Sequence, residues 1–265
     1  MAGPDRPARR DDGRPSLLER AVDRVPFLEK ELFLLRRLVR PGDVCVDVGA
    51  AGGAHLLVMA AGVGPHGRVL GFEPRPGSLA MLRRLVGLSR LGDRVTLHQL
   101  ALSDAEGTLP LRIPVVPTRA HFHGATDDRR ATAAFGRLPH REIEVPTARL
   151  DDVVARAGLS RVDLVKCDVE GAELRVLAGA SRVLDEHRPV VVLEADDLHQ
   201  VRANATSADV LAAVVAHGYR AYRYRRGAIE PVDGPVPGED DYLFVPTERD
   251  VPVSERRGAS AVDRV

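Results

Sequence analysis

The sequence predicts an α/β fold, with a mostly parallel seven-stranded sheet, an antiparallel edge strand and helices on both faces. From Asp43 onward, short apolar runs alternate with segments of helical periodicity. Such alternation is typical of right-handed βαβ units, which build a parallel sheet covered on both sides. The last two strands flank the Gly- and Pro-rich segment 227–238 and are expected to form the antiparallel edge.

The predicted elements follow one another closely along the chain. An N-terminal helical cap is expected over 17–40, because leucines recur there at helical spacing until Pro41-Gly42 ends the helix. The main domain covers 41–246. Its expected strands are 44–48, 68–72, 95–101, 162–167, 189–194, 219–224 and 241–245. Its expected helices are about 53–62, 77–89, 171–181 and 207–216.

Three segments lack such a pattern. Residues 1–16 are rich in Arg, Asp, Pro and Gly without an apolar stretch, so they indicate a disordered arm and not a signal peptide. Residues 247–265 are similar and are expected to form a loose tail. The segment 103–146 has no long period. We interpret it as a substrate lid in preference to a passive insertion.

Composition excludes some classes of partner and compartment. Lys+Arg and Asp+Glu both number 38, so no basic excess favours nucleic acid as a partner. The longest apolar run, 56–63, is far shorter than the ~20 residues that span a bilayer, so no membrane association is expected. The two cysteines, Cys45 and Cys167, lie in apolar strands, as buried thiols of a reducing compartment do. We therefore expect a cytoplasmic protein.

The strand Val44–Val48 runs into a glycine turn that is typical of a nucleoside-cofactor site. Asp47 and Gly49 lie at the strand end, followed by Ala50 and then by Gly53 at the helix start. Glycines let a backbone approach a ligand, and the helix N-terminus offers free N–H groups. The spacing D-x-G-x-x-x-G is not the G-x-G-x-x-G of dinucleotide sites, which favours S-adenosylmethionine over NAD. A tight turn without a ligand is the alternative.

Acidic residues at the next two strand ends complete the predicted cofactor site. Glu73 follows the second strand, where a carboxylate can accept both ribose hydroxyls. Ser103 and Asp104 follow the third, where a small residue can pack on the adenine and a carboxylate can accept from its amino group. An Asx turn ahead of Gly107 explains Asp104 equally well.

A second charged strand end lies at 162–173. Lys166 and Asp168 share one face of their strand, so they can pair or bracket a substrate. Glu170 and Glu173 fall at a helix start, and Glu173 is interpreted as a cap. Glu194 closes the neighbouring strand, and with Asp168 it forms a candidate Mg²⁺ site.

The order of these motifs resembles the FkbM-type methyltransferases over about residues 40–246. The motifs are Asp47 to Gly53, Phe72-Glu73-Pro74, Ala101 to Asp104, Arg149-Leu150-Asp151, Val165 to Glu173 and Arg188 to Glu194. The resemblance implies a class I, Rossmann-like fold that depends on S-adenosylmethionine. It also implies methyl transfer to an oxygen of a small molecule such as a polyketide or a sugar. The family commonly has Asn where Ala51 stands, so the side-chain contact to the cofactor that the resemblance implies at this position is not expected here, whereas the backbone cradle is.

Methyl transfer is an in-line displacement that needs an aligned hydroxyl and a group that removes its proton. The candidate bases are Asp168, Glu170 and, in the predicted lid, His121 and His123. Lys166 can hold Asp168 ionised or orient a substrate oxygen. The alternatives are an NAD-dependent oxidoreductase and a noncatalytic cofactor-binding or scaffold protein, with a nucleic-acid methyltransferase as a weaker third. The acceptor and the oligomeric state are left open.

Overall fold

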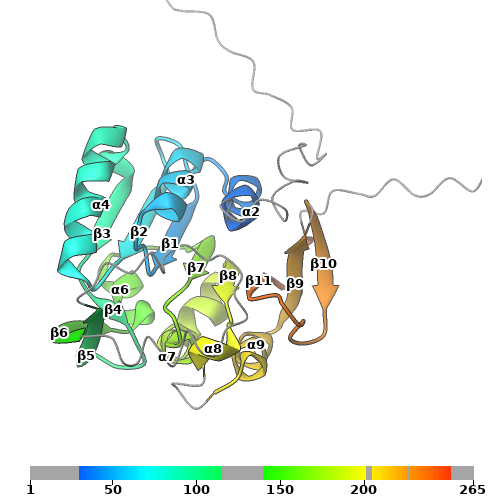
Figure 1. Ribbon diagram of the computed structural model, residues 1–265. Coiled ribbons are helices and arrows are strands. Elements are labelled where there is room, and N and C mark those ends of the chain that lie inside the picture. The colour runs from blue at the N-terminus through cyan, green and yellow to red at the C-terminus, as the bar shows by residue number, and fades with distance from the viewer. Residues whose placement is uncertain (1–29, 115–139, 201–204, 226, 252–265) are drawn as a thin grey trace, which may run out of the picture.

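The computed structural model describes residues 30–114, 140–200, 205–225 and 227–251 (Figure 1). The large sheet contains β1 (Val44–Val48), β2 (Arg68–Phe72), β3 (Val95–His98), β7 (Leu164–Cys167), β8 (Val190–Glu194), β9 (Tyr219–Arg225), β10 (Ala228–Val232) and β11 (Asp241–Pro246). A small sheet contains β4 (Ala101–Leu102), β5 (Gly107–Pro114) and β6 (His140–Ala148). The helices are α2 (Lys30–Leu38), α3 (Ala54–Gly62), α4 (Pro76–Ser89), α6 (Leu150–Arg156), α7 (Glu173–Ala178), α8 (Asp197–Gln200) and α9 (Ser207–Val215). A short 3-10 helix, η2 (Gly92–Arg94), and a π-helical segment, η4 (Val183–His187), complete the elements.

The large sheet has the strand order β10-β9-β11-β8-β7-β1-β2-β3. Strands β3, β2, β1, β7 and β8 run parallel, whereas β11 is antiparallel to both β8 and β9. The predicted parallel sheet with antiparallel strands at one side is therefore confirmed. It has eight strands and not seven, because β10 pairs antiparallel with β9 and forms the edge.

Strand β10 was not predicted, because the Gly and Pro content of segment 227–238 is typical of a loop. Gly227 has φ 76, a conformation that lets the chain reverse from β9 into β10. Pro231 lies on an edge strand, where a residue without an N–H is tolerated. The residues that argued against a strand are thus accommodated by its position.

The predicted third strand and the predicted lid differ from the structure. The strand expected at 95–101 ends at His98, and Ala101–Leu102 pairs instead with β6 in the small sheet. The two ends of segment 103–146 are regular, since Gly107–Pro114 of β5 pairs antiparallel with 140–147 of β6. Residues 115–139, with His121 and His123, lie outside the described residues, as do 1–29 and 252–265. A lid role for 103–146 stays a prediction.

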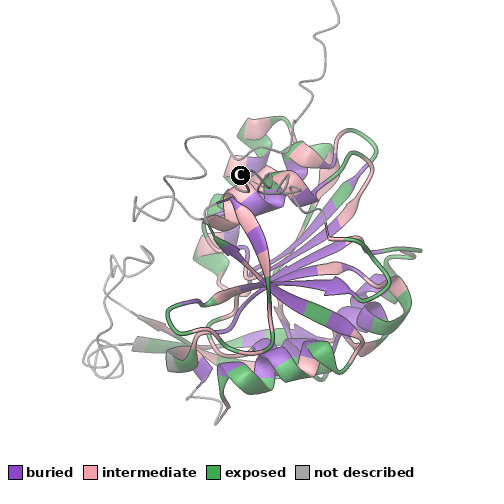
Figure 2. Cartoon of the chain, turned by 90° about the vertical axis from the view of Figure 1, so that its right-hand side faces the viewer, coloured by how far each residue is buried: buried purple, intermediate pink, exposed green. Residues whose placement is uncertain are grey.

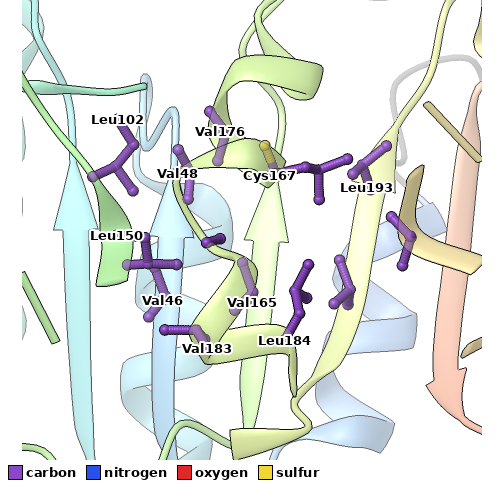
Figure 3. Packing of buried hydrophobic residues seen from close by; sticks show 14 of the residues in the cluster. Val46, Val48, Leu102, Leu150, Val165, Cys167, Val176, Val183, Leu184 and Leu193 are labelled. Atoms are coloured by element: carbon purple, nitrogen blue, oxygen red, sulfur yellow. The ribbon is translucent and has the colours of Figure 1, made fainter. Parts of the chain in front are cut away.

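Helices cover both faces of the large sheet, so nearly all its central strand residues are buried (Figure 2). On one face, Val46, Val48, Val165 and Cys167 pack against helices α6, α7 and α9 and the η4 segment (Figure 3). On the other, Cys45 and Leu164 pack with apolar residues of α2, α3 and α4. The two cysteines are free thiols on opposite faces of the sheet. No helix among the described residues is long and apolar enough to cross a bilayer.

Gly179 follows α7 directly and packs against the backbone of Ser103, the residue after β4 of the small sheet. A Cβ atom at this position would collide with the carbonyl oxygen of Ser103. We expect Gly179→Ala to lower the free energy of unfolding by about 1–3 kcal/mol, because backbone would have to shift. The matched control is Gly87→Ala in the exposed interior of α4, where a Cβ meets nothing within 4 Å. The control substitution should raise the free energy of unfolding by up to about 1 kcal/mol. Denaturant titration of both variants checks this, and equal effects would contradict it.

Candidate active site

The charged strand ends predicted from the sequence meet at one edge of the large sheet. Asp47 is the penultimate residue of β1 and the register partner of Lys166 on β7. Glu73 follows β2, Asp168 follows β7, and Glu194 ends β8. In a parallel sheet these carboxyl ends share one edge, which is where ligands bind in open α/β folds.

Lys166 is the centre of this edge. Its Nζ atom lies 3.2 Å from Asp168 Oδ2 and 3.8 Å from Asp47 Oδ1. The side chains of Lys166 and Asp47 are 3% and 0% exposed, whereas that of Asp168 is 27% exposed. Asp168 is thus the member of this group that a ligand can reach.

The charges of this group depend on one another. Burial alone would lower the pKa of the Lys166 ammonium, but the attraction of Asp168 and Asp47 outweighs it and raises that pKa. Burial raises the pKa of Asp47, against the opposing attraction of Lys166. Neither carboxylate oxygen of Asp47 has a hydrogen-bond partner among the described residues. The charge of Asp47 is therefore compensated mainly by the Lys166 ammonium and not by hydrogen bonds.

The glycine turn packs tightly onto this group. Gly49 has φ 82, and a Cβ there would collide with the carbonyl oxygen of Asp168. The amides of Gly49 and Ala50 both donate to the Phe72 carbonyl at 3.0 Å. Gly53 has φ 84, and a Cβ there would lie 2.6 Å from Leu82 Cδ2 of α4. Contacts within the protein therefore already require both glycines, whatever they do for a cofactor.

Glu73 is bound to the same turn. The carboxylate accepts from the Ala51 amide at 2.9 Å and from the Arg75 amide at 2.8 Å. The Arg75 guanidinium also contacts this carboxylate, and the Glu73 side chain is only 1% exposed. A carboxylate in this position fits the predicted ribose contact in place and charge, and that contact stays a prediction.

The remaining predicted residues are farther from this edge or have local roles. Ser103 is buried beside the small sheet and its hydroxyl donates to Asp104 at 2.9 Å, so their adenine contact also stays a prediction. Glu170 is exposed and has φ 52. Glu173 accepts from the amides of Val169 and Gly171 at 3.0 Å each, so it binds the loop that precedes α7, and its predicted capping role stays a prediction.

A row of carboxyl groups extends from Asp168 across the next two strands. Asp168 follows Cys167, the register partner of Leu193, and Glu194 lies directly opposite Asp241 of β11. We call Asp168, Glu194 and Asp241 the carboxylate row. Sequence reasoning missed Asp241, because its place depends on β11 lying between β8 and β9.

Helix α2 adds two charged residues that were also missed. Lys30 forms ion pairs with Glu239 and, at 3.2 Å, with Asp241. Glu31 lies 3.3 Å from Nε2 of His55, at the start of α3. Burial raises the pKa of Glu31, and burial together with Glu31 raises that of Asp241. The scarcity of lysine was a usable signal, because Lys30 and Lys166 are the only two in the chain.

His199 of α8 faces the middle of the row. Its Nδ1 lies 3.7 Å from Glu194 Oε2, and contact with Glu194 raises the pKa of His199 to about 9. Burial, then the nearby Asp168, raises the pKa of Glu194 to about 8. The described residues contain no group of three or more His, Cys, Asp or Glu side chains arranged to hold a metal ion. The predicted Mg²⁺ site at Asp168 and Glu194 is therefore not supported.

Comparison with known proteins identifies the family. The family model of the methyltransferase FkbM domain matches residues 47–221 of this chain. This range contains the glycine turn, Glu73 and the Lys166–Asp168 strand end. This chain belongs to the FkbM methyltransferase family. It is an S-adenosylmethionine-dependent methyltransferase, built on the mostly parallel α/β sheet described above.

Two curated relatives are similar to this FkbM family member. The 31-O-demethyl-FK506 methyltransferase FkbM of Streptomyces tacrolimicus is 31% identical over 84% of this chain and 86% of its own length. The 2-O-methyltransferase NoeI of Sinorhizobium fredii is 30% identical over 57% and 63%. Among solved structures, methyltransferase FkbM from Methylobacillus flagellatus is 19% identical, with a TM-score of 0.47, over 81% of this chain and 50% of that one.

The ion pair of Asp47 with Lys166 can be tested through stability. Lys166→Met leaves Asp47 buried without a cation, and we expect it to lower the free energy of unfolding by about 3–5 kcal/mol. The double variant Asp47→Asn with Lys166→Met removes both charges, so its free energy of unfolding should fall less than that of the single variant. Urea unfolding of both variants measures the difference. A double variant as unstable as the single one would show that the uncompensated charge is not the cause.

Glu194 should make the stability depend on pH. Its pKa rises from 4.5 to about 8 on folding, so the folded protein holds this proton more tightly than the unfolded chain. Stability therefore falls as the pH rises from about 4.5 to 8. The raised pKa of His199 has the same sign, but its largest cause is contact with Glu194, so the two groups titrate as one pair and not as two separate contributions.

We expect Glu194→Gln to flatten the curve of Tm against pH between about 5 and 8. Glu186→Gln, at an exposed carboxylate, is the control and should leave the slope unchanged. Thermal melts across this range measure both variants. A slope that Glu194→Gln does not alter would contradict the assignment.

Proposed function

We propose that this FkbM family member transfers a methyl group to a hydroxyl oxygen of a small molecule. The names of two relatives, a 31-O-demethyl-FK506 methyltransferase and a 2-O-methyltransferase, support oxygen as the acceptor atom. The observation that carries the proposal is the Lys166–Asp168 pair, in which a buried ammonium lies 3.2 Å from a carboxylate whose side chain is 27% exposed.

Asp168 is proposed as the general base. Its carboxylate is the exposed end of the buried group, so an acceptor hydroxyl can reach it. Lys166 donates to Asp168 and keeps the carboxylate ionised and oriented. Asp168 would accept the proton of the acceptor hydroxyl as the oxygen takes the methyl group and the methyl–sulfur bond of the sulfonium breaks, with a neutral thioether as the leaving group. Glu170, at a left-handed backbone position and exposed, is the weaker candidate.

The residues present fit the cofactor. S-adenosylmethionine supplies, when bound, a methyl group on a sulfonium that is activated for displacement. Glu73 would hold its ribose, and the buried Asp47, which lacks hydrogen-bond donors, would lie beside the glycine turn that receives it. Positioning of donor and acceptor is expected to supply much of the rate. No step here requires a metal ion.

A labelled-methyl assay tests the proposal. The purified protein is incubated with methyl-labelled S-adenosylmethionine and a panel of hydroxylated natural products. With an acceptor found this way, Asp168→Asn should lower kcat by about 10²- to 10⁴-fold, with little change in the Kd for S-adenosylhomocysteine. Glu170→Gln is the matched control and should lose far less. Dialysis against a chelator is expected to leave turnover unchanged.

The outcomes separate the alternatives. S-adenosylhomocysteine binding without turnover on any acceptor would favour the noncatalytic cofactor-binding protein. Transfer to nitrogen alone would reject the oxygen acceptor. Full activity of Asp168→Asn together with a loss in Glu170→Gln would move the role of base to Glu170.

A further inference from the structure

The carboxylate of Glu73 has no room for two further donors. Oε1 accepts from the Arg75 amide at 2.8 Å and from Arg75 Nε at 2.9 Å. Oε2 accepts from the Ala51 amide at 2.9 Å and from Arg75 Nη2 at 3.3 Å. A carboxylate offers about four lone-pair positions. All four are in use, and the side chain is 1% exposed.

The four donors differ in their freedom to move. The Ala51 and Arg75 amides belong to backbone that is set by the glycine turn and by the start of α4. The other two are N–H groups of one guanidinium, on a side chain that is 28% exposed. A ligand that donates two hydrogen bonds to Glu73 must therefore take the place of this guanidinium. A ribose diol is a ligand of this type.

We propose that Arg75 competes with the cofactor ribose for Glu73, so that the guanidinium occupies the ribose position until the cofactor displaces it. The inference rests on the proposed function, which assigns Glu73 to the ribose. Arg75 is then a residue that sets cofactor affinity without itself binding the cofactor.

The surroundings of Arg75 make the exchange feasible. The hydrogen bonds to Glu73 raise the pKa of the Arg75 guanidinium, and the negative charges of Glu170 and Asp168 raise it further. A guanidinium that leaves Glu73 therefore stays in an acidic environment.

A competitor inside the protein weakens the apparent affinity, because only the fraction with Glu73 free can bind. Arg75→Ala removes it and leaves both backbone donors in place. We expect this variant to bind S-adenosylmethionine and S-adenosylhomocysteine about 3- to 10-fold more tightly than the unmodified protein. Arg75→Gln, which keeps a polar side chain with weaker donors, should lie between the two.

Calorimetric titration with S-adenosylhomocysteine measures these affinities without any acceptor. Arg84→Ala, at an exposed arginine on the same helix, is the matched control and should leave the Kd unchanged. Glu73→Gln should weaken binding, and adding Arg75→Ala to it should give no gain. Thermal melts without ligand show whether each variant is folded.

Weaker binding by folded Arg75→Ala would show that Arg75 contacts the cofactor, and unchanged binding would show that it does not compete. Either result overturns this inference and leaves the proposed function intact. A gain from Arg75→Ala that persists in the Glu73→Gln background also overturns it. Failure of the unmodified protein to bind S-adenosylhomocysteine contradicts the proposed function itself.

Discussion

The buried ion pair between Lys166 and Asp47 is the constraint on which the rest of the site depends. An ammonium group inside a sheet is stable only when carboxylates compensate for the lost hydration. Asp47 comes from β1 and Lys166 from β7, which are adjacent parallel strands. The pair therefore ties the turn after β1 to the loop after β7. Gly49 shows how close these two segments come, because the Asp168 carbonyl leaves no space for a side chain there.

This constraint also explains how charge is distributed along the edge. Lys166 is shared between Asp47 and Asp168, so it does not neutralise the rest of the carboxylate row. Like charges on opposed strand positions are destabilising unless protons or cations lie between them. Lys30 at Asp241 and His199 at Glu194 supply part of that compensation. Since Lys30 belongs to α2, this helix is part of the electrostatics of this edge and not only a cover for the core.

Local pattern predicted much of the fold and part of the site. Alternation of apolar runs placed the parallel strands, and the period of two placed Lys166 and Asp168 on one face. Asp241, Glu31, His55 and His199 were missed because their positions follow from strand order and helix docking, which no local pattern encodes. Pro231 and Gly227 led to the prediction of a loop at β10, because Pro and Gly generally disfavour strands. Both residues are tolerated here, since β10 is an edge strand of a hairpin with β9.

The glycine turn carries less information about the cofactor than its spacing suggests. Gly49 is required by the Asp168 carbonyl and Gly53 by Leu82, so both would be retained in a fold of this kind without any ligand. The amides of Gly49 and Ala50 are already bonded to Phe72, and that of Ala51 to Glu73. Asp47 is fully buried against Lys166, so among these carboxylates Glu73 is the one that the proposed exchange with Arg75 opens to a ligand. The turn holds Glu73 through the Ala51 amide, and on this proposal the lone pairs that Arg75 vacates are what a cofactor ribose selects.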